Sequence, residues 1–369
     1  MINIIIVPQE YETANHRNLW LEMAKLTKDE IIVCNVSADY IVSYIRGKSW
    51  RIKDAKKDPI RFDNLLLFRP IFPVRPEILP ISLQKCMGYK FWSNIKRIAP
   101  EVMSQDVRLL CYDAMWVNML SGTHPKMKMA YYIFDEVRLH GRNGEIRKKA
   151  SRLDIEACKK ADVILTMTQD IADNRKEYRD KTIVIGNGSI LPCKNTAPEI
   201  KFRKSVAFIG NFRSWIDEEL LSKLVKKRCD LLFVIAGPVE NDMRSFFENL
   251  LNTNENVVYY GKVEKEKMPQ LYMMFDCVII PYKNNSFIKA TRPIKIVESV
   301  LSGTPVVTVP VNGYEQSSFI RYATTVDEFS REIDYLMEHP IDGDDVEYKE
   351  FVNNNTWSAK AKVIMNALG

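Results

Sequence analysis

The feature that most constrains this chain is an alternation of strands and helices that runs twice and is interrupted once. Short apolar runs rich in β-branched residues recur between amphipathic stretches, first up to Ile185 and again from Ser205. Continuous apolar strands separated by helical patterns are typical of parallel sheets covered on both faces. The sequence therefore predicts an α/β protein with two doubly wound, Rossmann-like domains, which face each other across a cleft lined by the carboxyl ends of their strands.

A turn-rich stretch at residues 186–198 separates the two halves. We place the domains at residues 1–190 and 200–350, followed by a C-terminal helix within 351–369 that starts at Thr356. The first domain is expected to contain strands at 4–7, 31–36, 65–68, 107–112, 129–134, 163–168 and 182–185, with helices at 16–26 and 145–160. The second is expected to contain strands at 205–209, 231–236, 257–260, 277–281 and 306–309, with helices from Asp217 and Asn241 and at 269–275 and 294–301.

Hydropathy and charge indicate where the protein is located and which partners it is expected to bind. No run reaches the roughly 18 uncharged apolar residues of a membrane helix, and residues 1–8 lack the basic region of a signal peptide. We therefore expect a cytoplasmic protein. Residues 1–190 hold 31 Lys and Arg against 23 Asp and Glu, which indicates either an anionic acceptor or surface, or a solvated lysine-rich face. The basic residues are dispersed and no recognition motif accompanies them, so nucleic acid is not an expected partner.

The most specific motif lies at residues 292–307, RPIKIVESVLSGTPVV. Pro293 suits the first turn of a helix, and Lys295 and Glu298, three residues apart, project from one face of it. A helix N-terminus with a lysine beside it favours a diphosphate, and a carboxylate one turn later can accept hydrogen bonds from ribose hydroxyls. The alternative is an ordinary Lys–Glu pair on a helix surface.

This run resembles the P-x-K-x-x-E-x-x-x-x-G-x-P-V-V signature of glycosyl transferases group 1, a large family with the GT-B fold. The resemblance implies that residues 1–190 bind the acceptor, that residues 200–350 bind a nucleotide-sugar donor, and that the C-terminal helix packs back on the N-terminal domain. It implies a metal-independent hexosyl- or glycuronosyltransferase with no cofactor besides its donor, for which UDP is the commonest nucleotide in the family. The donor-binding residues that it implies are Gly210, Arg213, Lys262, Tyr282, Lys295 and Glu298.

The first half matches the family more loosely. Residues 156–164, EACKKADVI, and 185–188, IGNG, resemble segments of its acceptor domain, and 131–136, YYIFDE, is similar to a strand end in bacterial cell-wall and exopolysaccharide transferases. The similarity is greatest to the teichuronic-acid-type branch. It implies transfer to a glycan or a lipid-linked acceptor in the synthesis of a bacterial surface polysaccharide.

Asp135 is the candidate catalytic base, because it follows an apolar strand at the carboxyl end that faces the expected cleft. A helix N-cap is the competing interpretation. Glu136 is a close rival and His140 a weaker one, while His16 is expected to be a surface histidine. Retaining members of the family carry an acidic residue where this chain has Ala290, and their glycine-rich loop after the first strand is absent here. Both retention and direct inversion therefore stay open.

Two segments combine basic residues with aromatics, 46–57 and 85–97. They suit contact with the anionic inner face of the cell membrane, or else helices with aromatics in the core and lysines in water. We expect no metal site, because no CxxC pair exists among the seven cysteines and the acidic stretch 342–345 is expected to be a solvated loop. Other functions considered are an inactive GT-B scaffold or regulatory protein and a nucleotide-sugar epimerase.

Overall fold

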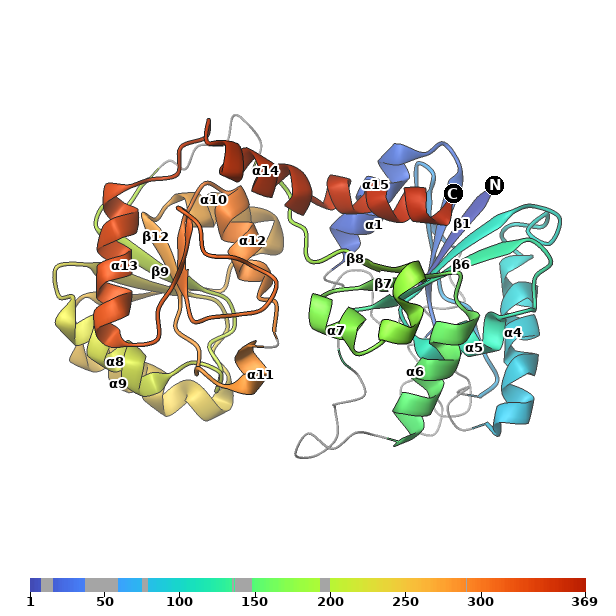
Figure 1. Ribbon diagram of the computed structural model, residues 1–369, viewed down its shortest axis with the longest axis horizontal. Coiled ribbons are helices and arrows are strands. Elements are labelled where there is room, and N and C mark those ends of the chain that lie inside the picture. The colour runs from blue at the N-terminus through green and yellow to red at the C-terminus, as the bar shows by residue number, and fades with distance from the viewer. Residues whose placement is uncertain are drawn as a thin grey trace. The chain divides into compact units, whose positions relative to one another are not determined.

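The computed structural model describes residues 1–7, 16–36, 59–74, 79–134, 136, 148–192, 200–289 and 291–369. The chain divides into two compact units, Met1–Ile185 with Ala361–Gly369, and Gly186–Lys360. Each unit is built around one largely parallel sheet (Figure 1). The predicted fold class, two Rossmann-like α/β domains, is confirmed.

The sheet of the first unit has the strand order β3-β4-β2-β1-β5-β6-β7-β8. All neighbouring strands pair in parallel except β3 and β4, which are antiparallel. The strands are β1 (Ile2–Val7), β2 (Glu30–Asn35), β3 (Ile60–Phe62), β4 (Leu65–Phe68), β5 (Val107–Cys111), β6 (Met127–Ile133), β7 (Val163–Thr166) and β8 (Thr182–Val184). The short edge strand β3 was not predicted, because all three of its residues are exposed and give no apolar run.

Helices cover this sheet on both faces, as a doubly wound fold requires. Figure 1 shows α4, α5 and α6 along one side of the sheet and α1 on the other. Asp113 and Thr168 cap α5 and α7 by accepting hydrogen bonds from backbone N–H groups of the first turn. The helices are α1 (Arg17–Leu26), α4 (Ile81–Ile95), α5 (Ala114–Leu120), α6 (Lys148–Lys160) and α7 (Gln169–Asp173).

The second unit contains a parallel sheet with the strand order β11-β10-β9-β12-β13-β14. Its strands are β9 (Ser205–Ile209), β10 (Leu232–Ala236), β11 (Val257–Gly261), β12 (Cys277–Ile280), β13 (Val306–Thr308) and β14 (Ile320–Tyr322). Its helices are α8 (Glu218–Lys227), α9 (Arg244–Thr253), α10 (Met268–Met273), α11 (Ser286–Lys289), α12 (Ile294–Leu301), α13 (Val326–Glu338) and α14 (Val346–Asn355). Helices α8, α9 and α13 lie on one side of the sheet, and α10 and α12 on the other (Figure 1).

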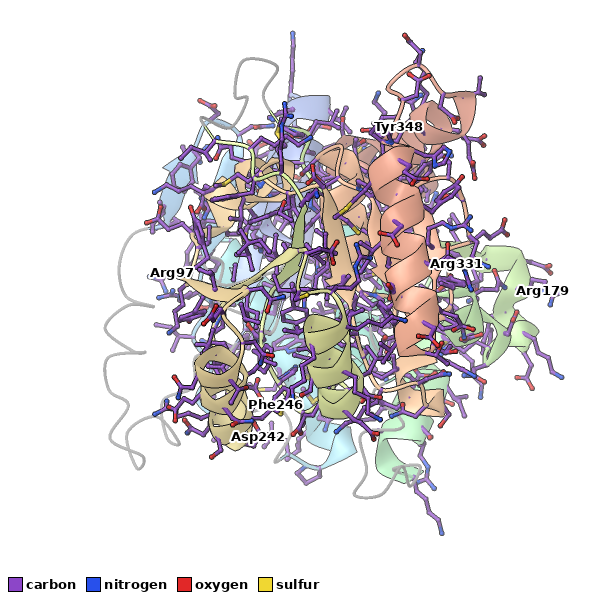
Figure 2. The ribbon with its side chains drawn as sticks, turned by 90° about the vertical axis from the view of Figure 1, so that its left-hand side faces the viewer. Arg97, Arg179, Asp242, Phe246, Arg331 and Tyr348 are labelled. Atoms are coloured by element: carbon purple, nitrogen blue, oxygen red, sulfur yellow. The ribbon has the colours of Figure 1, made fainter. Side chains whose placement is uncertain are left out.

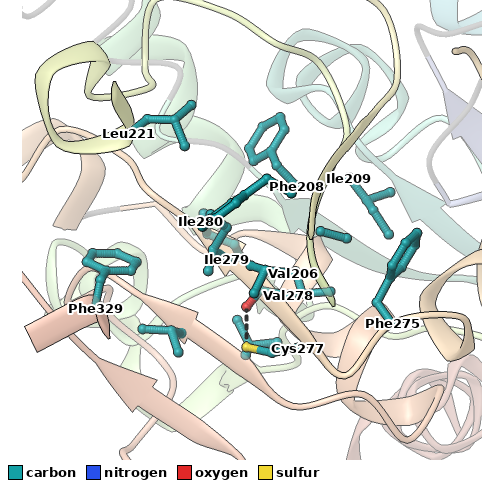
Figure 3. Close-up of a cluster of buried hydrophobic side chains, with 14 of the residues drawn as sticks. Val206, Phe208, Ile209, Leu221, Phe275, Cys277, Val278, Ile279, Ile280 and Phe329 are labelled. Carbon is teal, nitrogen blue, oxygen red and sulfur yellow. Dashed lines mark hydrogen bonds between the residues drawn. The ribbon is translucent and has the colours of Figure 1, made fainter. Parts of the chain in front are cut away.

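The core of the second unit forms where both helix layers meet the central strands. Val206 and Phe208 of β9 and Val278 and Ile280 of β12 are almost fully buried, and Phe329 of α13 packs in the same cluster (Figure 3). At its rim, the ring of Phe246 on α9 stacks on that of Phe212 at 6.0 Å between centroids (Figure 2). This packing fixes the strand ends at which a ligand of such a sheet binds.

The last helix, α15 (Trp357–Leu368), begins just after a short bridge between Ser189 and Thr356. The hydroxyl of Thr356 accepts a hydrogen bond from the backbone N–H of Ala359 at 3.1 Å, so the predicted cap is present. Residues up to Lys360 belong to the second unit, and those from Ala361 to the first.

Candidate functional site

The second unit has a topological switch point between β9 and β12. Strands β10 and β11 lie on one side of β9, whereas β12, β13 and β14 lie on the other. Ligands of doubly wound sheets bind outside the carboxyl ends of the strands at such a point. Here Gly210 follows β9, Tyr282 follows β12, and α12 presents Lys295 in its first turn.

Two glycines make close packing possible at these strand ends. Gly210 and Gly237 have φ values of +132° and +126°, and the N–H of Gly210 donates a hydrogen bond to the carbonyl of Ala236 at 2.7 Å. A Cβ atom on Gly237 would lie 2.3 Å from the carbonyl oxygen of Gly210, and one on Gly210 would lie 2.5 Å from Nζ of Lys295. Both positions therefore require glycine, and the lysine side chain lies directly against the end of β9.

Lys295 is held by aromatic side chains. Its ammonium donates a hydrogen bond to the hydroxyl of Tyr282 at 2.8 Å and lies 4.4 Å from the ring centroid of Phe208. A cation over a ring face is attracted by the ring quadrupole. The structure thus brings together three of the predicted residues, Gly210, Tyr282 and Lys295, and fixes a positive charge at the start of α12, where an anionic group is favoured.

Glu298 lies one turn further along α12. Its carboxylate accepts a hydrogen bond from the hydroxyl of Tyr272 at 3.1 Å. Burial raises the pKa of Glu298, against the opposing effects of Tyr272 and of Lys265 and Lys295. A carboxylate that accepts one hydrogen bond from Tyr272 has further lone pairs that can accept hydrogen bonds from the hydroxyls of a ligand. Tyr272 was missed by sequence reasoning, because it lies in an apolar helical pattern where a core tyrosine gives the same signal.

The other two predicted donor residues are not in contact with Lys295. The guanidinium of Arg213 donates to one carboxylate oxygen of Glu240 at 2.7 and 3.0 Å and stacks over the ring of Trp215. Lys262 is exposed, and its side chain makes no hydrogen bond or ion pair with any residue that the structure describes. The donor-binding roles of Arg213 and Lys262 stay predictions.

In the first unit, Asp135 and His140 lie outside the described residues, whereas Glu136 is visible in a buried ion network. Arg175 donates to both carboxylate oxygens of Glu136 at 3.0 and 3.1 Å, and to both of Asp154 at 3.0 Å. A neighbouring guanidinium stabilises a carboxylate in its charged form and so makes it a weaker base. The catalytic role of Glu136 stays a prediction, and Asp135 remains the other candidate.

His16 was expected at the surface, and that expectation is wrong. The side chain is 8% exposed, and its ring lies 5.4 Å from the rings of Tyr112 and Tyr132 and 6.1 Å from Phe134. These aromatics follow or end β5 and β6, next to the switch point between β1 and β5. His16 lies at the start of α1, over these strand ends. The polar residues next to it in the sequence gave no sign that its side chain is buried.

The second unit is similar to a known family. Residues 203–339 match the family described as Glycosyl transferases group 1, in agreement with the resemblance of residues 292–307 to its signature. TuaH of Bacillus subtilis (strain 168), assigned as a glycosyltransferase of teichuronic acid biosynthesis, is 22% identical over 261 residues, 67% of this chain and 62% of TuaH. The chain thus spans less than two thirds of the length of that relative.

Solved glycosyltransferases share the whole fold. HepE of Anabaena, in complex with UDP and glucose, superposes with a TM-score of 0.58 at 14% identity, over 100% of this chain and 97% of HepE. The lipopolysaccharide outer core galactosyltransferase WaaB superposes with a TM-score of 0.63 at 12% identity, over 100% of this chain and 99% of WaaB. The predicted GT-B fold is thereby confirmed.

Two further features concern metals and membranes. The first is the absence of a metal-binding cluster: among the described residues, no group of three or more His, Cys, Asp or Glu side chains is arranged to hold a metal ion. The acidic stretch 342–345 forms a loop, as predicted, and its last residue, Asp345, also caps α14 through the N–H groups of Glu347 and Tyr348. In the same part of the chain, no helix is both long and apolar enough to span a membrane.

Proposed function

We propose that this protein is a glycosyltransferase that moves a sugar from a nucleotide-sugar, with UDP as the nucleotide, to a glycan or lipid-linked acceptor of a bacterial surface polysaccharide. The observation that carries the proposal is the placement of Lys295 against Gly210 and Tyr282, with Glu298 one turn along the same helix. A cation and a carboxylate so spaced fit the diphosphate and the ribose of a nucleotide. The bound UDP of HepE and the assignment of TuaH support the same chemistry.

In this proposal the second unit stabilises the leaving group. The negative charge that develops on the diphosphate during sugar transfer meets the ammonium of Lys295 and the N-terminus of α12. Charged groups fixed in advance where charge develops are a large source of catalysis. The close approach of the backbone at Gly210 and Gly237 leaves room for phosphate oxygens. No metal ion is required by this scheme, and residues 200–350 act as the donor domain.

The acceptor is assigned to residues 1–190, to which the C-terminal helix at 351–369 is expected to return. Asp135 is the proposed base that takes the proton from the acceptor hydroxyl, since Arg175 holds Glu136 as an ion pair. Exchange of Asp135 for Asn should lower kcat while leaving UDP affinity unchanged. An Asp135→Asn variant with undiminished transfer would refute this role.

Contact with an anionic membrane surface is proposed through α4. The segment 79–100 carries no acidic residue. Phe91 and Trp92 are buried, so these aromatics belong to the core, but Tyr89 is 57% exposed. The exposed cations along and just after the helix are Lys85, Lys90, Lys96 and Arg97, of which Figure 2 labels Arg97. A basic helix face with an exposed aromatic suits an anionic lipid interface; the second basic segment, 46–57, lies outside the described residues.

Flotation with vesicles of phosphatidylglycerol and phosphatidylcholine tests this contact. Replacement of Lys85, Lys90 and Lys96 by Gln should release the protein at low salt, while vesicles of phosphatidylcholine alone should bind neither form. Absence of wild-type flotation at low salt would refute membrane contact without affecting the assignment of the enzyme.

The donor site is tested by calorimetry with UDP, GDP, ADP and CMP. We expect wild-type protein to bind UDP and Glu298→Ala to lose at least about tenfold in affinity, because hydrogen bonds to a charged group contribute about 1.5–3 kcal/mol. Glu338→Ala, at an exposed position of α13, is the matched control. Absence of binding to every nucleotide would refute the donor site and favour a scaffold without activity. Unchanged UDP binding in Glu298→Ala would refute the role of Glu298.

A further inference from the structure

One exposed aromatic side chain, Phe287, and one half-buried one, Trp215, lie beside the proposed donor site. Phe287, on α11, is 57% exposed although it is a large apolar residue. Its ring lies 5.5 Å from that of Trp215, and the ring of Trp215 lies 6.1 Å from that of Tyr282. We call Trp215 and Phe287 the aromatic platform. Packing in the core accounts for the aromatic ring of Tyr282, which is buried. It does not account for the ring of Phe287, which is exposed to solvent.

Two cationic residues lie beside the aromatic platform. Arg213 stacks over the ring of Trp215 at 4.4 Å and pairs with Glu240. Lys283 is anchored beside the platform, because its backbone N–H donates to the carbonyl of Trp215 at 2.8 Å. Its side chain is exposed and forms no hydrogen bond or ion pair within the described part of the chain.

The nearby acidic groups do not neutralise Lys283. Glu240 is bound to Arg213, and Asp217 accepts the N–H of Leu220 as the cap of α8. Lys289, at the end of α11, is exposed and is likewise without an ion pair among the residues described. The loop between β12 and α12 therefore presents an aromatic surface next to uncompensated positive charge.

Tyr282 connects the aromatic platform to Lys295, where the diphosphate is proposed to bind. Tyr282 packs edge-on against Trp215, and its hydroxyl accepts the hydrogen bond of Lys295. A group resting on the platform would thus be separated from the proposed diphosphate position by the side chain of Tyr282. At this place a transferase needs the acceptor or the sugar of the donor.

We propose that the aromatic platform binds an anionic pyranose of the acceptor glycan, which deepens the proposed function and rests on it. The apolar C–H face of the sugar stacks on the exposed ring of Phe287, which Trp215 supports edge-on. An aromatic ring offers a large contact area at low entropic cost. A carboxylate or phosphate on the same sugar meets the ammonium of Lys283. Charge complementarity selects an anionic saccharide over a neutral one.

The test measures binding of two tetrasaccharides by calorimetry in saturating UDP. A hyaluronan tetrasaccharide carries glucuronate, whereas chitotetraose of the same length is neutral. We expect the wild type to prefer the hyaluronan fragment at low salt. Phe287→Ala should weaken its binding about tenfold, as truncation of an aromatic contact residue does, and Phe287→Tyr should retain it. Lys283→Gln should cost about two- to fivefold, an effect that salt reduces. Lys226→Gln, at an exposed position near the other end of α8, should have no effect.

Three results would overturn the proposal. Equal binding of the neutral and anionic tetrasaccharides would refute the charge selection, and unchanged affinity in Phe287→Ala would refute the platform. If Lys283→Gln instead alters the preference between UDP-glucuronate and UDP-glucose, the anionic sugar belongs to the donor and the acceptor assignment is wrong. UDP affinity is recorded for each variant, so that a failed donor site, which would refute the proposed function itself, is distinguished from a failed platform.

Discussion

A buried lysine makes the stability of this protein depend on pH in an unusual direction. Lys360, near the start of α15, is 8% exposed, and its ammonium donates one hydrogen bond, to the side-chain oxygen of Asn355 at 3.3 Å. Burial, assisted by the charge of Arg292, lowers the pKa of Lys360 from 10.5 to about 8. The charged form is thus destabilised in the folded protein.

The size of the effect follows from that shift. A pKa that is lower by this amount corresponds to a penalty of about 3 kcal/mol at pH 7, where Lys360 is protonated in both states. Between about pH 8 and 10.5 the unfolded chain binds more protons than the folded one, so this penalty disappears as the pH rises. Lys360→Met removes the penalty and costs about 1 kcal/mol for the lost hydrogen bond. The variant should be more stable than the wild type by about 2 kcal/mol at pH 7 and slightly less stable at pH 10.5.

Urea unfolding of both proteins at pH 7 and pH 10.5 checks this prediction. Lys362→Met is the matched control, because Lys362 is exposed on the same helix and should show no change between the two pH values. A difference between Lys360→Met and wild type that is the same at both pH values would show that Lys360 is not destabilised by its charge.

Three further predictions concern the two units. Gly210→Ala places a Cβ at a φ of +132° and 2.5 Å from Nζ of Lys295; we expect about 1–3 kcal/mol of strain in urea unfolding and at least tenfold weaker UDP binding by calorimetry. Tyr272→Phe removes the donor to Glu298 and should weaken UDP binding about three- to tenfold with little loss of stability. Arg175→Met removes the guanidinium that pairs with the carboxylates of Asp154 and Glu136 and should cost about 3–5 kcal/mol, whereas Arg179→Met, at an exposed position (Figure 2), should cost almost nothing. Equal effects of the two arginine variants would contradict the last prediction.

Local signals account for the elements that the sequence located well. Helix α12 spans residues 294–301 as predicted, because Pro293 fixes its start and Gly303, with a φ of +79°, follows its end. Strand β9 also has its predicted bounds, since it is a wholly buried run next to polar residues. Strand β14 and helix α14 were missed. The strand has only three residues, and the helix has no strong apolar face that would mark it in the sequence.

The candidate site was predictable where its residues share one element, and not where distant segments meet. Lys295 and Glu298 lie on one helix, so their spacing places both. Arg175 and Glu136 are 39 residues apart in the sequence, and no local pattern links them. His16 gives the same sequence signal on a surface as in an aromatic cluster, and only its packing against the ends of β5 and β6 distinguishes the two.

The partners of three cations separate two arginines that stabilise the fold from a lysine that fits a diphosphate. Arg175 is matched by two carboxylates and Arg213 by one, so little of their charge is left for an incoming anion. Lys295 is held by a phenol hydroxyl and a ring face, and none of the carboxylates in the described chain forms an ion pair with it. Glu298 attracts it only through space. Aromatic groups fix the position of the ammonium without neutralising it, which is the arrangement that the proposed stabilisation of a departing diphosphate requires.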